Sequence, residues 1–243
     1  MKGIILAGDS GSRMHPLTQA IPKQLLPLYD RPMIFYPIET LAKAGITEIL
    51  IITSPEHSDT FKKALGDGSQ FNAHFSYTTQ DTPNGIAQAI AIGKEFIGND
   101  SVCLITGDTI IVGDGLTPLI NKAERAVNNS GCATIFVNRD NDPNQYGKVI
   151  MNQKGKVETI VGSSDNYNYC SITGLYVYPN NVLTKIDQLH PSERGLYEIT
   201  ELNTLYFNEN KMQVLQLPKE CHWLDTNSFD SLLAASNFIC KTR

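Results

Sequence analysis

Two cations stand close to a loop of small residues near the start of the chain. Gly8, Gly11 and Ser12 follow a short apolar run, and Arg13 and Lys23 come after them. Small residues let backbone N–H groups approach phosphate oxygens, while a guanidinium and an ammonium can neutralise the charge of a triphosphate. The segment does not contain the G-x-x-x-x-G-K-S/T pattern of a Walker loop. The residues alone leave two interpretations open, a phosphate site or an ordinary strand-to-helix loop with two solvated cations.

Two aspartates follow apolar segments farther along the chain. Asp108 comes after the run 102–106, and Asp225 comes after Trp223 and Leu224. A carboxylate at the end of a buried element can face a cleft, and Mg²⁺ typically takes one or two protein carboxylates and completes its octahedron with phosphate oxygens and water. Aspartates in such places also serve as helix caps or surface acids. Both interpretations stay open at this point.

A polar segment in the first half of the chain contains Gln80, and Gly85 follows five residues later. A side-chain amide both donates and accepts hydrogen bonds, so Gln80 can pair with the edge of thymine or uracil. A solvated glutamine fits the same segment equally well.

Length and composition limit the class of protein. The 243 residues, of which 41% are hydrophobic and 19% charged, suit one compact α/β domain. A net charge of -5 and a pI of about 5.5 argue against a nucleic-acid-binding surface, which needs clustered cations. The five cysteines are scattered and lack C-x-x-C spacing, which favours a reducing cytoplasm over disulfides or a zinc site. The apolar opening, 3–7, is too short for a signal peptide or a membrane span.

Short apolar runs alternate with longer segments of helical periodicity, and these elements must position the residues above. Strands are expected at 2–6, 48–53, 74–79, 102–106 and 133–137. Helices are expected at 38–44, 61–65, 86–96 and 116–127. Such alternation predicts a Rossmann-like α/β fold, a mostly parallel twisted sheet with helices on both faces. The Gly/Ser loop then lies at the carboxyl end of a strand, where open α/β sheets bind ligands.

The pattern changes after about residue 146. The runs 148–151 and 156–160 flank a turn and predict a hairpin, and 171–178 predicts a further strand, so this half should form a small antiparallel lobe. The segment 228–240 predicts an amphipathic helix that covers the core. We therefore expect a single domain, 1–243, with a nucleotide-binding part, 1–145, and an acceptor-binding part, 146–243.

Ordered motifs along essentially the whole chain resemble those of the glucose-1-phosphate thymidylyltransferases, a family of sugar-1-phosphate nucleotidylyltransferases. The motifs are, in chain order, 2–8, 16–18, 22–27, 31–34, 66–69, Gln80, 84–89, 107–108, 146–147, 173–176, 191–195, 198–200 and 223–226.

The resemblance implies a Mg²⁺-dependent transfer of a nucleoside monophosphate from dTTP or UTP to a sugar 1-phosphate, with release of pyrophosphate. It implies catalytic roles for Arg13 and Lys23, and Mg²⁺ ligation by Asp108 and Asp225. It assigns nucleotide binding to Leu6, Gly8, Gly11, Ser12, Gln80 and Gly85, and acceptor binding to Gly147, Thr173 and Arg194. It also implies a homodimer or homotetramer. The partners expected are small molecules, an anionic acceptor among them, rather than a nucleic acid or a membrane.

The phosphate loop departs from the family pattern at one position. Asp9 stands where the family normally has a glycine. An acid beside a triphosphate is repulsive unless it turns away, is protonated or binds a cation. We therefore expect Asp9 to weaken nucleotide binding.

The acceptor side departs from the pattern more strongly. The family's Glu-Glu-Lys-Pro segment falls on Ile160, Val161, Gly162 and Ser163, and Leu196 stands where an acid is usual. We therefore expect poor use of glucose 1-phosphate, because a site without its polar partners loses discrimination. Alternative functions are transfer to another phosphate or phosphonate acceptor, or a catalytically impaired nucleotide-binding subunit. The candidates to replace the missing groups are Lys148, Lys154 and Lys156.

Overall fold

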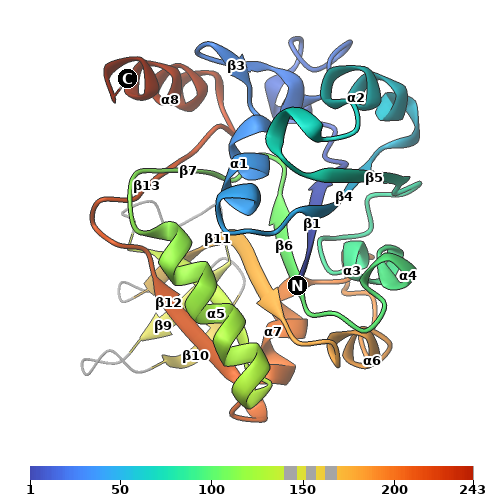
Figure 1. Ribbon diagram of the computed structural model, residues 1–243, viewed down its shortest axis with the longest axis vertical. Helices are drawn as coiled ribbons and strands as arrows, with labels where there is room; N and C mark the ends of the chain where they lie inside the picture. Colours follow the sequence, from blue (N-terminus) through green and yellow to red (C-terminus); the bar gives the residue numbers. More distant parts are fainter. Residues whose placement is uncertain (140–146, 152–156, 162–168, 243) are drawn as a thin grey trace.

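The computed structural model describes residues 1–139, 147–151, 157–161 and 169–242. Its main feature is a sheet of nine strands (Figure 1). Seven of them are, in spatial order, β10 (Val157–Val161), β9 (Lys148–Met151), β11 (Tyr169–Tyr178), β6 (Val102–Thr106), β1 (Lys2–Ala7), β4 (Glu48–Thr53) and β5 (His74–Thr79). The other two are β8 (Ala133–Asn138), which pairs with β11, and β12 (Met212–Gln216), which pairs with β8.

Strand direction divides the sheet into two parts. β1, β4, β5 and β6 are mutually parallel, and β12 is parallel to β8. β11 is antiparallel to β6, β8 and β9, and β10 is antiparallel to β9. The predicted α/β sheet, parallel in its first half with an antiparallel part after residue 146, is therefore confirmed.

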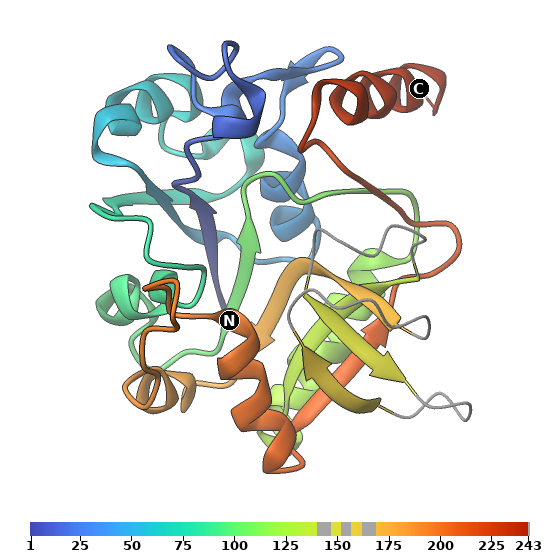
Figure 2. The same ribbon diagram turned by 180° about the vertical axis from the view of Figure 1, so that it is seen from behind.

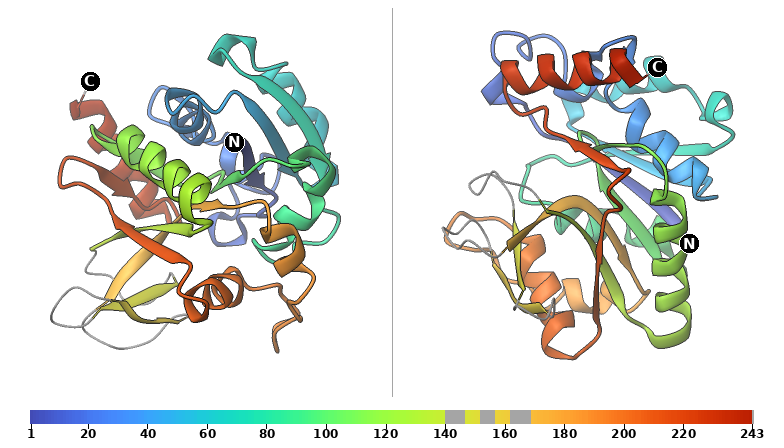
Figure 3. Two further views of the ribbon diagram at one scale, coloured as in Figure 1. Left: turned by 60° about the horizontal axis from the view of Figure 1, so that its bottom comes forward. Right: turned by 90° about the vertical axis from the view of Figure 1, so that its left-hand side faces the viewer.

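Alternation of apolar side chains along the strands produces a separate core on each face of the sheet. In β1, for example, Ile4 belongs to one core and Ile5 to the other. The helices α5 (Leu116–Ser130) and α7 (Ile199–Asn208) lie on opposite faces of the sheet, as the edge-on view at the right of Figure 3 shows. α5 is in front in Figure 1, and α7 is in front in Figure 2. One core contains residues from α3 (Gln88–Ile92), α4 (Lys94–Ile97), α6 (Val182–Ile186) and α7 (Ile199–Asn208). The other contains residues from α1 (Phe35–Lys43), α2 (Ser58–Leu65) and α5 (Leu116–Ser130).

The order of the strands reverses at β1. The chain passes from β1 to β4 and β5 on one side, and then returns to β6 on the other side. In open α/β sheets a crevice forms at the carboxyl ends of the strands that flank such a switch. β1 ends at Ala7 and β6 ends at Thr106, so Gly8, directly after β1, and Asp108, two residues after β6, lie at this crevice.

Two sequence predictions about helices need correction. The helix expected over 86–96 is two short helices that meet at Gly93, where the backbone ψ is 4° instead of a helical value. The C-terminal helix, α8 (Phe229–Thr242), packs on a small third cluster that includes Leu28 and Ile110 rather than on either main core. None of the helices in the described part of the chain has the length and apolar character needed to span a bilayer.

A buried polar contact joins β11 to α7. The hydroxyl of Tyr178 donates to Asn203 Oδ1 at 2.6 Å, and both side chains are fully buried. Asn203 Nδ2 has no hydrogen-bond partner among the described residues. The pair therefore sets the position of α7 against the strand that carries Thr173.

We predict that Tyr178→Phe lowers the free energy of unfolding by about 1–3 kcal/mol, because it leaves the buried Asn203 Oδ1 without this donor. Urea denaturation followed by circular dichroism measures the change. The control is Tyr77→Phe, which removes a more exposed hydrogen bond to the Gly66 carbonyl and should have a smaller effect. Equal unfolding midpoints for Tyr178→Phe and the wild type would contradict the prediction.

Candidate active site

A cleft of about 700 Å³ opens where the strand order reverses. It is lined by the end of β1, the residues after β6, one stretch of β11, the start of α7 and the segment between residues 223 and 227. Several residues singled out from the sequence line it, and these are Leu6, Asp9, Arg13, Asp108, Gly147, Thr173, Arg194 and Asp225.

Lys23 enters this region from a short 3-10 helix, Lys23–Leu25. Its side chain is only 1% exposed, and its ammonium lies 2.5 Å from Asp108 Oδ2. A second acceptor, Asn227 Oδ1, is 2.8 Å from the ammonium. A buried cation requires such partners, because burying an unpaired charge is costly. Lys23 is therefore not a solvated surface lysine, but a buried cation behind Asp108; it is not among the described residues that line the cleft.

Asp108 is ionised by its surroundings. Burial tends to raise the pKa of its carboxyl, but the ammonium of Lys23 and hydrogen bonds from Lys23 and Thr106 outweigh burial and hold the pKa below its ordinary value. The Thr106 hydroxyl donates to Asp108 Oδ1 at 2.9 Å. The aspartate thus presents a negative charge to the cleft.

Hydroxyl groups connect this aspartate to β11. Thr106 Oγ1 and Thr109 Oγ1 are 2.7 Å apart, and Thr109 Oγ1 donates to the Thr173 carbonyl at 2.9 Å. The close approach depends on Gly174, which has a φ of +83° and where a Cβ would lie 2.5 Å from Thr109 Oγ1. Asp108, the candidate metal ligand, is therefore connected to β11 through the hydroxyls of Thr106 and Thr109.

Asp225 reaches the same place through a two-stranded ribbon. β13 (His222–Leu224) pairs with β7 (Ile110–Val112), and Leu224 lies opposite Ile110. Asp225 Oδ1 then accepts the backbone N–H of Asn227 at 3.2 Å and its side-chain amide at 2.7 Å. This short turn brings the aspartate from the chain's last quarter to the cleft.

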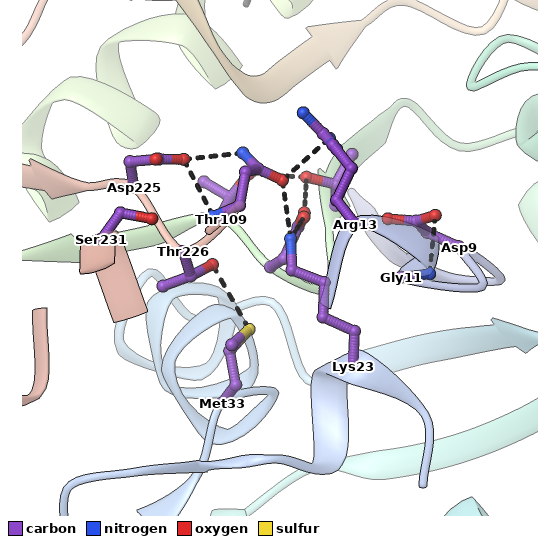
Figure 4. Close-up of polar contacts among 12 residues, drawn as sticks. Asp9, Gly11, Arg13, Lys23, Met33, Thr109, Asp225, Thr226 and Ser231 are labelled. Atoms are coloured by element: carbon purple, nitrogen blue, oxygen red, sulfur yellow. Dashed lines mark hydrogen bonds and ion pairs between the residues drawn. The ribbon is translucent and has the colours of Figure 1, made fainter. Parts of the chain in front are cut away.

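Arg13 is joined to that turn. Its Nη2 donates to Asn227 Oδ1 at 3.1 Å, and Figure 4 draws the contacts of Arg13, Lys23 and Asp225 as one connected set. Asn227 therefore accepts from both cations while it donates to Asp225. Two cations and two carboxylates meet at one point of the cleft.

The predicted phosphate loop contains a hydrogen bond between two of its own residues. Gly11 has a φ of +63°, and a Cβ there would lie 2.9 Å from Lys23 Cβ, so this position requires glycine. Asp9 Oδ1 accepts the Gly11 backbone N–H at 3.1 Å (Figure 4). A carboxylate thus occupies an N–H group of the kind that binds phosphate. The described residues that line the cleft do not include Gly8, Gly11 or Ser12.

Gln80 is buried beside the loop and is not solvated. Its amide donates to Gln88 Oε1 at 2.6 Å and to the Gly85 carbonyl at 3.2 Å. A Cβ at Gly8 would lie 3.0 Å from Gln80 Oε1. Neither Gln80 nor Gly85 is among the described residues that line the cleft. The structure thus brings Gln80, Gly85 and Gly8 together at the edge of the cleft, with both amide hydrogens already used.

Arg194, expected from the sequence to bind the acceptor, forms an ion pair with Glu198. Both line the cleft, and Arg194 Nη2 is 2.8 Å from Glu198 Oε1. Arg194 is 73% exposed, so this ion pair contributes little to stability. Ser192 Oγ also donates to Glu198 Oε1, at 3.0 Å. An anion that enters here meets a cation already held by a carboxylate.

Of the positions expected to lack acceptor-binding groups, Ile160 and Leu196 can be placed, and neither lines the cleft. Ile160 packs in a hydrophobic core, and Leu196 is outside the lining among the described residues. Of the lysines proposed as replacements, Lys148 is fully buried, with its ammonium 4.5 Å from the centre of the Tyr169 ring. The side chain of Val161 and residues Gly162, Ser163, Lys154 and Lys156 lie outside the described part of the chain.

Four further residues of this region were missed by sequence reasoning, and they are Gln24, Thr109, Glu198 and Asn227. Gln24 lines the cleft, and its Oε1 is buried without a partner among the described residues. The only signal for Asn227 was its place two residues after Asp225, the spacing of a turn in which an aspartate accepts a backbone N–H. Glu198 already belonged to a quoted motif but carried no assigned role.

Comparison with known proteins agrees with this geometry. The sequence model of the nucleotidyl transferase family matches residues 2–242. The chain is 44% identical to the glucose-1-phosphate thymidylyltransferase of Neisseria meningitidis and 45% identical to that of Mycolicibacterium smegmatis, each over 98% of this chain and 82% of the relative. A crystal structure of a Bacillus anthracis protein that carries the same enzyme name, in complex with sucrose, superposes with a TM-score of 0.89 at 34% identity, covering 98% of this chain and 94% of that one.

We predict that Asp108→Asn destabilises the protein by about 3 kcal/mol at neutral pH, because it leaves the buried Lys23 ammonium without its carboxylate. The pKa of Asp108 is lowered in the folded protein, so its contribution is complete above the ordinary aspartate pKa and is lost as the pH falls through the lowered value. Urea denaturation at several pH values should therefore show a gap to the wild type that narrows in acid.

The control is Asp59→Asn, since Asp59 is 89% exposed and pairs with Lys62 at the surface. This change should leave the unfolding midpoint nearly unchanged. A gap for Asp108→Asn that is absent at neutral pH, or that stays constant in acid, would count against the ion pair.

Proposed function

The chain belongs to the nucleotidyl transferase family and is similar to glucose-1-phosphate thymidylyltransferases over 98% of its length, and from this premise we propose that it transfers a thymidylyl group from dTTP to a sugar 1-phosphate. The products are a dTDP-sugar and pyrophosphate. The observation that carries the proposal is that Arg13, Asp108 and Asp225 line the switch-point cleft, with Lys23 bonded to Asp108 behind it.

The two aspartates fit a magnesium ion. Both line the cleft, and Asp108 is held ionised by its neighbours. Hard carboxylate oxygens suit Mg²⁺, and one or two of them suffice when phosphate oxygens complete the coordination. We propose that Asp108 and Asp225 hold Mg²⁺, which when bound supplies charge to the nucleotide phosphates.

The residues of the chain act by position and charge. An oxygen of the sugar phosphate attacks the α-phosphorus of dTTP, a new P–O bond forms, and the bond to the β-phosphate breaks as pyrophosphate leaves. The nucleophile is already an anion, so this step needs no general base. Arg13 and Lys23 offset the repulsion between the two phosphates and the charge on the leaving group. The cleft walls align the reactants.

The acceptor binds on the β11 and α7 side in this proposal. Gly147, Thr173 and Arg194 line that wall, and Arg194 can exchange its contact with Glu198 for a phosphate oxygen. Gln80 and Gly85 bind the base at the other end, after Gln80 releases one of its present acceptors. We also propose a single domain over 1–243 and, on resemblance, a homodimer or homotetramer. The five cysteines are all free thiols, which fits the reducing compartment expected from the sequence.

We predict that the protein releases pyrophosphate from dTTP only when a sugar 1-phosphate and Mg²⁺ are present. Arg13→Ala should lower kcat/KM about a hundredfold, because a charge that stabilises the transition state is removed. A coupled pyrophosphate assay measures both, with UTP and other anionic acceptors as alternative substrates.

The matched control is Arg125→Ala, on the exposed surface of α5, which should keep the wild-type rate. Similar small effects from both arginine changes would reduce Arg13 to a surface cation. If dTTP and UTP give no pyrophosphate with any acceptor, the proposed activity is wrong.

Asp9 gives a separate prediction about nucleotide affinity. Its carboxylate occupies the Gly11 N–H and carries a charge that repels phosphate, so Asp9→Gly should bind dTTP several-fold more tightly. Asp9→Asn, which keeps an oxygen acceptor but removes the charge, should fall between the wild type and Asp9→Gly. Isothermal titration measures the three affinities. Weaker binding by Asp9→Gly would show that the carboxylate instead helps to shape the loop.

A further inference from the structure

Asn227 occupies the point where the two cations meet the second aspartate. Its Oδ1 is 2.8 Å from Lys23 Nζ and 3.1 Å from Arg13 Nη2. Its Nδ2 is 2.7 Å from Asp225 Oδ1, and its backbone N–H donates to the same oxygen. An amide has an acceptor at one side and a donor at the other, so Asn227 satisfies opposite charges at both ends.

The two cations depend on Asn227 to different degrees. Lys23 is buried and is also held by Asp108. Arg13 is exposed, and its hydrogen bond to Asn227 is the only one it makes within the described part of the chain. A long exposed side chain has considerable rotamer entropy to lose when it is ordered. The orientation of Arg13 toward the cleft therefore depends on Asn227.

Asn227 is neutral, which limits how strongly it binds the two cations. A carboxylate at this place would bind Arg13 and Lys23 with stronger, charge-assisted hydrogen bonds and would add repulsion beside Asp225. An amide oxygen holds the cations more weakly than a phosphate oxygen does. Arg13 and Lys23 can therefore be oriented before a triphosphate arrives and still exchange Asn227 for it.

We propose that Asn227 is a positioning residue, which orients Arg13 and Lys23 for the nucleotide triphosphate and links them to Asp225. The inference rests on the proposed function, because it takes the triphosphate as the anion that the cations receive. Asn227 acts through Arg13 and Asp225 and does not itself contact the reacting atoms.

The test is a double-mutant cycle on dTTP affinity, measured by isothermal titration in EDTA so that no metal contributes. Asn227→Ala should bind dTTP about tenfold more weakly than the wild type, the worth of one hydrogen bond to a charged group. In the Arg13→Ala background the same change should cost no more than about twofold, because its partner is already gone. The isosteric Asn227→Asp should also bind more weakly, and Asn129→Ala on the exposed face of α5 should bind like the wild type.

A readout without nucleotide separates this inference from the proposed function. In the unliganded protein, phenylglyoxal should modify Arg13 several-fold faster in Asn227→Ala than in the wild type. Arg31, which is paired with Glu39 at 2.5 Å, should react at the same rate in both and serves as the internal reference. Mass spectrometry of the peptides gives the two rates.

The possible results distinguish the positioning role of Asn227 from the proposed function. An unchanged Arg13 modification rate, or an equal loss of affinity in both backgrounds, overturns the positioning role of Asn227. Absence of dTTP binding by the wild type both in EDTA and with Mg²⁺, together with the expected change in Arg13 reactivity, supports the positioning role and rejects the proposed function.

Discussion

Lys23 carries its ammonium into the protein interior, where a charge is stable only beside an opposite charge. Asp108 supplies that charge from the end of β6, 85 residues farther along the chain. The N-terminal segment is therefore bound to the carboxyl end of the central sheet. Asn227, 204 residues from Lys23, joins the C-terminal segment to the same ammonium. One buried cation thus brings together three distant parts of the chain, and the cleft forms where they meet.

The backbone must allow these segments to come close, and two glycines do so. Gly11 turns the phosphate loop over Lys23, and Gly174 lets β11 approach Thr106 and Thr109. Both have positive φ values, at +63° and +83°, that a residue with a side chain rarely adopts. The ion pair and the threonine contacts then hold the loop and β11 in place. Charge, hydroxyl contacts and backbone shape are therefore mutually dependent in this site.

The sequence was informative where the signal is local. The apolar runs that became β1, β4, β5 and β6 could be recognised because alternation and length are properties of a few consecutive residues. The close approach of Gly93 to Ile4 could not be foreseen, since it is a contact with a distant strand. The same holds in the site. Residue type pointed to Lys23 and Asp108, but only the fold shows that they form a buried pair, and Asn227 has meaning only through partners far away in the chain.

The ion pair at Arg194 differs in character from the one at Lys23. Lys23 is buried and held in place by Asp108, whereas Arg194 is largely exposed and its partner Glu198 lies four residues away on the same short stretch. An exposed ion pair costs little to separate, so an incoming phosphate can take Arg194 from Glu198 without disturbing the fold. The freed Glu198 carboxylate would then face the cleft and could accept hydrogen bonds from sugar hydroxyls. This wall of the cleft therefore carries both a cation and a carboxylate, because Arg194 and Glu198 both line it.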